Sequence, residues 1–240
     1  MKILSLGAGV QSSALLLLAV KREIECDGIM FADTGVEKPT TYEFLEELKK
    51  IVKEATIPYQ EVAYKGGATL YDYCIKYRVM PSVIRRWCTD EFKISPIAKA
   101  LKGQDAEVMV GFSFDEQHRA KRGYQLPYKR VFPLIELRLT QWDCGQIIIG
   151  YGLPVPTKSS CYLCPFQHPN SWRWIKRTFP DLFAKALEVE ENFYRRKPEK
   201  RDFMGLFSGL PLWKAMGEGE QGLLMPWVEN IGCYSGHCFR

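Results

Sequence analysis

Two cysteines at the spacing Cys161-x-x-Cys164 have the clearest chemical potential in the chain. Two thiolates at this spacing can bind one metal from a tight turn, and Pro165 stiffens the exit of that turn. The same pair can instead form a redox-active dithiol. A closed site with four thiolates needs two further ligands. The sequence therefore predicts either a thiolate metal site or a dithiol at residues 161–164.

Other cysteines extend this prediction. Cys233 and Cys238 stand at the spacing Cys-x4-Cys, and either of them would complete a metal site. Thiolates suit zinc and iron–sulfur clusters alike, so ligand type does not separate the two. The cysteines that lie in apolar or helical patterns are expected to be buried and unreactive, namely Cys26, Cys74 and Cys144.

A glycine-containing turn near the start of the chain is the second chemical signal. Gly7-Ala8-Gly9-Val10-Gln11-Ser12-Ser13 follows a short apolar run and precedes an apolar helix. Such a turn presents backbone N–H groups and the positive end of a helix to an anion, and two hydroxyls can donate to phosphate oxygens. It is neither a Walker A loop nor GxGxxG, because Ser12 stands where the third glycine belongs. A tight turn without a ligand is the plain alternative.

Strands that alternate with helices are expected to position this turn. Apolar runs predict strands at 3–6, 29–32, 59–64 and 107–112, and helical patterns occur at 12–20, 41–54 and 89–101. This alternation is typical of a doubly wound, mostly parallel α/β sheet of the Rossmann-like kind. In such sheets ligands lie beyond the carboxyl ends of the strands, where the turns 7–12, 33–39 and 111–119 would converge.

The pattern changes after about Pro165. Two helices are predicted at 171–179 and 180–196, and glycines then break up the tail. We therefore expect a nucleotide-binding α/β domain at 1–166. A helical and irregular C-terminal extension at 167–240 is expected to pack on it.

Composition and charge restrict the class of protein. The 240 residues are 46% hydrophobic and 25% charged, which excludes a disordered, collagen-like or rod-shaped chain. The apolar stretch 14–20 is too short for a membrane span, and no signal peptide is recognised, so a cytoplasmic protein without membrane association is expected. The net charge of +5 and a basic second half suit an anionic ligand, either nucleotide phosphates or nucleic acid.

Five segments, in this order, resemble the phosphoadenosine-phosphosulfate (PAPS) reductase branch of the PP-loop superfamily, which has the adenine nucleotide alpha-hydrolase fold. They are the loop 7–12, Asp33-Thr34-Gly35 with Pro39-Thr40-Thr41-Tyr42, Cys88 with Lys93 and Pro96, Gly111 to Glu116 with Arg119, and Pro133-Leu134 followed by Gly152-Leu153-Pro154 and the CxxC pair. The resemblance covers residues 1–166. Departures from the family pattern are Gly7 for the first serine of the loop, Ala8 for a glycine, Gln11 for the loop aspartate and Ser113 for an arginine.

The resemblance implies an adenine nucleotide, either ATP or a sulfonucleotide (APS or PAPS), together with Mg²⁺. The residues expected to bind it are Gly7, Ala8, Gly9, Gln11, Ser12, Ser13, Asp33, Thr34, Gly111 and Arg119. Asp33 suits Mg²⁺ or a ribose hydroxyl, Lys93 and Arg119 can neutralise developing charge, and Glu116 joins them in the catalytic set. The plain alternatives are that Asp33 is a helix N-cap and that Lys93 and Arg119 are solvent-exposed charges.

The resemblance also implies a 4Fe–4S cluster, with zinc as the second choice. Its ligands would be Cys88, Cys161 and Cys164, completed by Cys233 or else by Cys238. The reductases of the family carry a catalytic cysteine near their C-terminus. Cys238, with His237 or Arg240 nearby, is the candidate for that nucleophile.

Three functions follow from these expectations. The first is ATP-dependent activation coupled to sulfur transfer onto a nucleic acid or a small molecule, with a sulfur-donor or electron-donor protein as partner. The second is thiol-dependent reduction of a sulfonucleotide to sulfite. The third is a non-catalytic module that binds a nucleotide or associates with DNA. Homodimers are common among relatives, so a homodimer is also considered.

Overall fold

The computed structural model describes residues 1–120, 126 and 128–216, and these form two compact units. Unit 1 contains residues 1–33, 38–63 and 92–159, apart from 121–125 and 127. Unit 2 contains residues 34–37, 64–91 and 160–216. The units are interleaved along the chain, whereas the predicted division was a single boundary at residue 166. The difference arises because segment 64–91 carries a helix that packs against the second predicted C-terminal helix.

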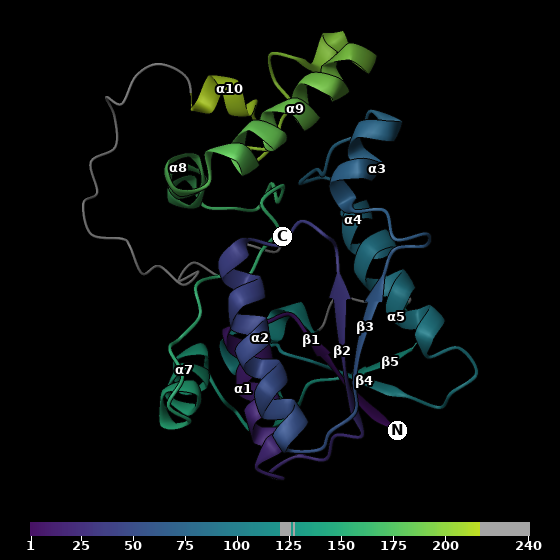
Figure 1. Cartoon of the computed structure of the whole chain (residues 1–240), viewed down its shortest axis with the longest axis vertical. Coiled ribbons are helices and arrows are strands. Elements are labelled where there is room, and N and C mark those ends of the chain that lie inside the picture. Colours follow the sequence, from purple (N-terminus) through teal and green to yellow (C-terminus); the bar gives the residue numbers. More distant parts are fainter. Residues whose placement is uncertain (121–125, 127, 217–240) are drawn as a thin grey trace. The chain divides into compact units, whose positions relative to one another are not determined.

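Unit 1 is built on a parallel sheet with the strand order β3-β2-β1-β4-β5. Figure 1 shows this sheet with helices on both faces. The strands are β1 (Lys2–Leu6), β2 (Gly28–Asp33), β3 (Tyr59–Ala63), β4 (Glu107–Val110) and β5 (Lys129–Val131). The first four match the predicted strands. The fifth was not predicted, because a three-residue strand beginning Lys-Arg has no apolar pattern. The predicted parallel α/β class is confirmed.

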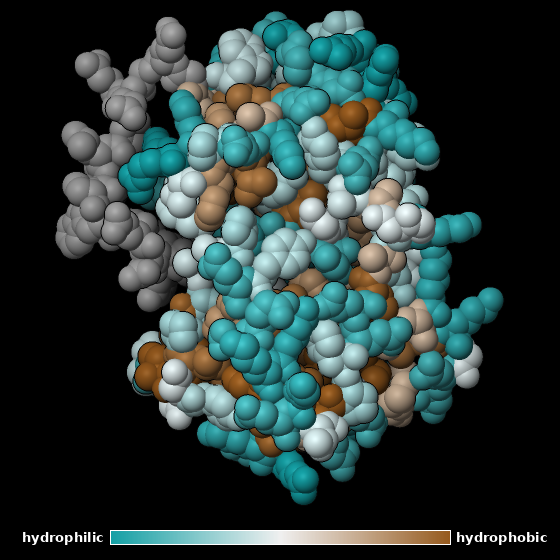
Figure 2. Space-filling model, in the orientation of Figure 1, coloured by the Kyte–Doolittle hydropathy of each residue, from teal (hydrophilic) through white to brown (hydrophobic). Residues whose placement is uncertain are grey.

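Alternation along β1 explains the two-sided core of unit 1. Leu4 and Leu6 pack with helices α1 (Val10–Val20), α2 (Pro39–Glu54) and α7 (Gln141–Gly150). Ile3 faces the opposite side and packs with Ile97 of α5 (Ser95–Ala100). α1 is almost wholly buried, whereas α2 is amphipathic, and its outward face is hydrophilic in Figure 2. The sheet and α1 therefore form a rigid base for the turn that joins them.

The predicted helix at 89–101 is interrupted in the structure. It consists of α4 (Trp87–Thr89), the π-helical segment η1 (Asp90–Ile94) and α5. A π-helical turn is a local widening of a helix and is frequent at functional sites. Cys88 and Lys93, both predicted site residues, lie on α4 and η1 respectively.

Unit 2 is mainly helical. Its helices include α3 (Leu70–Tyr77), α8 (Pro169–Thr178), α9 (Pro180–Arg196) and α10 (Leu212–Ala215). The predictions at 171–179 and 180–196 correspond to α8 and α9, whereas α3 was not predicted. α3 is fixed to α9 by Asn192, whose amide donates a hydrogen bond of 2.6 Å to the Ile75 carbonyl. Within the described part of the chain, no helix has the length and apolarity needed to cross a membrane.

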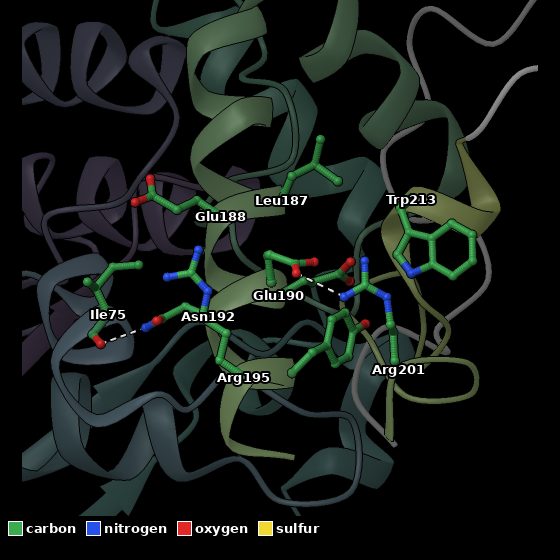
Figure 3. A pocket seen from close by; sticks show the side chains of 10 residues that line it. Ile75, Leu187, Glu188, Glu190, Asn192, Arg195, Arg201 and Trp213 are labelled. Atoms are coloured by element: carbon green, nitrogen blue, oxygen red, sulfur yellow. Dashed lines mark hydrogen bonds and ion pairs between the residues drawn. The ribbon is translucent and has the colours of Figure 1, made fainter. Parts of the chain in front are cut away.

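A buried carboxylate ties the end of unit 2 to α9. Glu190 is 1% exposed, and its oxygens accept hydrogen bonds from the backbone N–H groups of Leu206 (2.6 Å) and Leu212 (2.9 Å). It lies at a pocket of about 470 Å³ that is also lined by Trp213 and Arg201 (Figure 3). Burial raises the pKa of Glu190 to about 7, against the opposing effect of its backbone hydrogen bonds.

This pKa predicts how stability changes with pH. The folded protein binds the Glu190 proton more tightly than the unfolded chain, so the stabilisation is complete below about pH 4.5 and is lost as pH rises through about 7. The loss is on the order of 3 kcal/mol, since each pKa unit is worth about 1.4 kcal/mol. Glu190→Gln keeps an acceptor oxygen but cannot ionise, so we expect its free energy of unfolding to vary less between pH 5 and 8.

Urea unfolding followed by tryptophan fluorescence at several pH values measures this difference. Glu199→Gln is the matched control, because Glu199 is exposed in the same part of unit 2. Parallel pH profiles for wild type and Glu190→Gln would show that Glu190 does not titrate in this range.

Candidate functional site

The turn after β1 combines a helix N-terminus with a residue in the left-handed conformation. Gly9 is the N-cap of α1, and Ala8 has φ = +49° while being almost fully buried. The left-handed region costs a residue with a Cβ about 1–2 kcal/mol. This loop therefore keeps a left-handed conformation at the position where the family pattern has glycine. The conformation is maintained by the surrounding structure.

The Ser12 hydroxyl closes the turn in this structure. Its Oγ accepts hydrogen bonds from the N–H groups of Gly7 (3.2 Å) and Gly9 (3.3 Å) and donates to the Gly9 carbonyl (3.3 Å). These are N–H groups that a phosphate oxygen would use. A bound phosphate must therefore share these donors with Ser12 or displace its hydroxyl.

The end of β4 touches this turn through backbone atoms. A Cβ built on Gly111 would lie 2.8 Å from the Ser12 nitrogen and 2.9 Å from the Ser12 Cα. Only glycine permits this approach, since backbone atoms cannot move aside as the end of a side chain can. The strand order places β1 between β2 and β4, so the turns after β1 and β4 meet at the carboxyl edge, as predicted for 7–12 and 111–119.

Glu116 joins the two turns through side chains. It accepts a hydrogen bond from the Gln11 amide (3.2 Å) and forms an ion pair with Arg119 (2.8 Å). The Arg119 guanidinium lies 4.0 Å from the centroid of the Phe112 ring. Arg119 and Glu116 are mostly buried, so the alternative interpretation of Arg119 as a solvent-exposed charge is wrong.

Gln11 stands where the family pattern has an aspartate, and its amide donates an N–H to Glu116. The amide makes this contact without adding a second negative charge beside Glu116.

Asp33 lies at the carboxyl end of β2, next to β1. Its Oδ1 accepts a hydrogen bond of 2.7 Å from the Tyr42 hydroxyl on α2. The N-cap of α2 is Lys38, so the alternative interpretation of Asp33 as that N-cap is wrong. Thr34, the next residue, belongs to unit 2, where its hydroxyl donates to Glu37 (3.2 Å).

Two serine hydroxyls of unit 1 are buried without a hydrogen-bond partner. The hydroxyl oxygens of Ser13 and Ser113 are fully buried and have no hydrogen-bond partner in the structure. Unsatisfied buried hydroxyls are costly and are usually paired with a ligand, an ion or water. Ser13 was predicted to bind phosphate. Ser113 was noted only as a departure from the family pattern, and its position two residues after Gly111 was the available signal.

The cysteine pair of unit 2 lies in the tight turn that its spacing predicted. Cys161 and Cys164 lie in one tight turn, with a hydrogen bond of 3.1 Å from the Cys164 N–H to the Cys161 carbonyl, and their thiols are also hydrogen-bonded. This thiol contact and burial raise the pKa of Cys161, and nearby Glu37 and Cys88 add to the effect. A bound cation would reverse this trend, since it stabilises thiolates.

The ligand set of a metal site is incomplete in the described part of the chain. Among residues 1–120, 126 and 128–216, no three His, Cys, Asp or Glu side chains are arranged to hold a metal ion. Cys88 is close enough to Cys161 to influence its pKa. The predicted residues Cys233 and Cys238, with His237 and Arg240, lie outside the described residues. The thiol pair thus fits one part of a metal centre.

Three cysteines, Cys26, Cys74 and Cys144, have the properties of inert thiols. Burial raises the pKa of Cys26 and of Cys74, and it raises the pKa of Cys144 to about 12. A thiol in this state carries little thiolate at neutral pH and is a poor nucleophile. These residues are therefore suitable controls for the cysteine pair.

Comparison with known proteins shows which family the sequence matches. Residues 2–141 match the family described as "Phosphoadenosine phosphosulfate reductase domain". Two uncharacterised proteins of Methanocaldococcus jannaschii are similar: MJ0973, 26% identical over 79% of this chain and 47% of that protein, and MJ0066, 22% identical over 88% and 45%. The chain thus spans about half the length of these relatives.

Two solved structures are also similar in part. One is a PAPS reductase from Candida auris in a phosphate complex (TM-score 0.46, 16% identity, 65% of this chain and 74% of that one). The other is the U34-tRNA thiolase NcsA from Methanococcus maripaludis with its 4Fe–4S cluster (TM-score 0.49, 14% identity, 93% and 78%). Both likenesses are distant.

The close contact of Gly111 with the turn predicts what happens when a methyl group is added at this position. Gly111→Ala places a Cβ against the backbone of Ser12, and overpacking of this kind costs about 1–3 kcal/mol. We expect a lower melting temperature and weaker adenine nucleotide binding in the variant. Gly150→Ala is the control, because nothing lies within 4 Å of a Cβ at that position.

Calorimetry for stability and titration with ATP for affinity provide the two measurements. Wild-type stability and affinity in Gly111→Ala would show that the turn tolerates displacement and that the close approach is not needed.

Proposed function

Since the chain belongs to the phosphoadenosine phosphosulfate reductase domain family, we propose that it binds an adenine nucleotide at the turn 7–13 and activates an acceptor for sulfur transfer. The observation that carries this proposal is the meeting of the turns after β1 and β4, with Gly111 against the backbone of Ser12. Two buried, unpartnered hydroxyls, Ser13 and Ser113, add donors for phosphate oxygens in the same unit.

The phosphate end of the nucleotide would lie at the N-terminus of α1. Backbone N–H groups of Gly7 and Gly9, now held by the Ser12 hydroxyl, would turn to phosphate oxygens. Asp33, oriented by Tyr42, would hold Mg²⁺, which supplies charge neutralisation for the departing pyrophosphate. A carboxylate at this position would repel an unaccompanied phosphate.

Charge stabilisation would come from Arg119 and Lys93. Arg119 is paired with Glu116, so an incoming phosphate competes for a guanidinium that is already oriented by Phe112. In the reaction an acceptor oxygen bonds to the α-phosphorus and the bond to the β-phosphate breaks, releasing pyrophosphate. Sulfide supplied by a donor protein then forms a bond to the acceptor carbon, and AMP leaves with the oxygen.

The cysteines would hold the cofactor. Cys88, Cys161 and Cys164, completed by Cys233, are proposed as ligands of a 4Fe–4S cluster, with zinc and Cys238 as the second choices for metal and fourth ligand. The support from the structure is the contact between the Cys161 and Cys164 thiols and the nearby Cys88. When bound, such a cluster supplies iron that can bind sulfide or transfer electrons.

The distribution of charge favours a nucleic acid as acceptor. The described residues of unit 2 include 15 Lys and Arg against 10 Asp and Glu, whereas unit 1 has 15 of each. The positive charge of the described chain therefore belongs to unit 2. A basic surface attracts a polyanion through its phosphates.

A second candidate function has its own support. The family takes its name from the reductase that acts on PAPS, so reduction of a sulfonucleotide to sulfite remains the competing proposal. The expected nucleophile, Cys238, lies outside the described residues. The two activities differ in their products, which makes them separable.

Product analysis tests the proposal. The purified protein is incubated with ATP, Mg²⁺, sulfide and bulk tRNA or oligonucleotides, and separately with PAPS or APS and a thiol reductant. We expect AMP and pyrophosphate from ATP, with sulfur incorporated into nucleic acid. Sulfite from the sulfonucleotide with no ATP turnover would establish the reductase instead. Tight nucleotide binding without either product would indicate a binding module.

The cofactor is tested by metal analysis after purification without oxygen. We expect close to four irons per chain and broad absorption near about 400 nm. Cys161→Ser and Cys164→Ser should abolish the colour, whereas Cys26→Ser, a control in unit 1, should retain it. Stoichiometric zinc, or no metal in the wild type, would contradict the cluster.

A further inference from the structure

We propose that Lys38, Lys158 and Ser159 form a second wall of the turn 7–13 and select a polyphosphate, such as the triphosphate of ATP, over a nucleotide with a single phosphate. This inference rests on the proposed nucleotide site and adds three residues to it that the sequence did not indicate. All three belong to unit 1.

Ser159 lies directly against the turn. A Cβ built on Gly9 would be 2.5 Å from the Ser159 Oγ and 3.5 Å from its Cβ. Gly9 is the N-cap of α1, so the hydroxyl lies at the positive end of a helix of eleven residues. A hydroxyl at this position can donate to a phosphate oxygen bound by the turn.

Lys38 holds the segment that carries Ser159. Its ammonium donates a hydrogen bond of 2.7 Å to the Lys158 carbonyl, which belongs to the peptide unit that leads into Ser159. Lys38 is 3% exposed and is the N-cap of α2, which begins a few residues after Asp33. One peptide unit therefore separates a buried ammonium from the hydroxyl that contacts Gly9.

Lys158 brings a second ammonium to the same segment. Its Nζ is also buried, although a lysine is usually solvated. Buried cationic groups are weakly screened, so they attract an anion more strongly than surface lysines do. A triphosphate carries about twice the charge of a monophosphate, so a cation beside the turn attracts it more strongly. The two lysines should therefore contribute more to ATP than to AMP.

The test is the ratio of two affinities. Dissociation constants for ATP and AMP are measured by calorimetric titration of wild type, Lys38→Met and Lys158→Met, and inorganic tripolyphosphate is titrated as a probe that lacks adenine. Lys53→Met is the control, because Lys53 is exposed in the last turn of the same helix α2. Lys38→Arg keeps the charge. The ratio corrects for any misfolded fraction, because both nucleotides are titrated into the same preparation.

We expect each Met variant to lose about tenfold or more of its affinity for ATP and tripolyphosphate, with AMP affected less than about threefold. Lys38→Arg should recover part of the loss, and Lys53→Met should match wild type. Equal losses of affinity for ATP and AMP, or no loss, would overturn the inference. Lys38 would then only hold the segment 158–159 in place, and the proposed adenine nucleotide site would still stand. If tripolyphosphate binding depends on Lys38 but ATP binds no more tightly than tripolyphosphate, the result would support the wall and contradict the proposed adenine nucleotide site. A wild type that binds none of the probes would overturn both.

Discussion

The candidate nucleotide site of unit 1 depends on a backbone contact between the turn after β1 and the end of β4. The strand order makes β1 the neighbour of both β2 and β4, so three carboxyl ends meet at one edge of the sheet. The buried helix α1 fixes the turn from one side, and the missing side chain at Gly111 lets the other backbone reach Ser12. A ligand at this edge meets a turn whose backbone is already fixed, which reduces the entropy lost on binding, but it must share the Gly7 and Gly9 N–H groups with Ser12 or displace its hydroxyl.

The chain departs from its family pattern at residues that the structure connects. Gln11 replaces a carboxylate and donates to Glu116, and Glu116 in turn pairs with Arg119. The loop thus carries a neutral amide where the family pattern has a carboxylate. Ala8 adopts a left-handed conformation, which has a local energetic cost for a residue with a Cβ.

Hydrogen bonds from polar side chains of α9 connect the segments of unit 2. The buried Glu190 satisfies backbone N–H groups of the segment that follows α9, and Asn192 connects α9 to α3. The thiols of Cys161 and Cys164 are brought together by one tight turn. In this environment burial and thiol contact favour the protonated form of Cys161, so a cation is what would convert the pair into thiolates.

The sequence by itself determined the parallel α/β class, four of the five strands, the turn 7–13 and the cysteine pair, because these are recorded in local patterns of apolar, glycine and cysteine residues. It did not reveal β5 or α3, which are short and weakly patterned. Only the tertiary structure decided that Glu116 contacts Gln11, that Ser113 is buried without a partner, and that Ser159 lies against Gly9 beside the segment held by Lys38. These pairs are separated by tens of residues or more along the chain, or depend on burial. Packing of the folded chain establishes such contacts, and no local spacing records them.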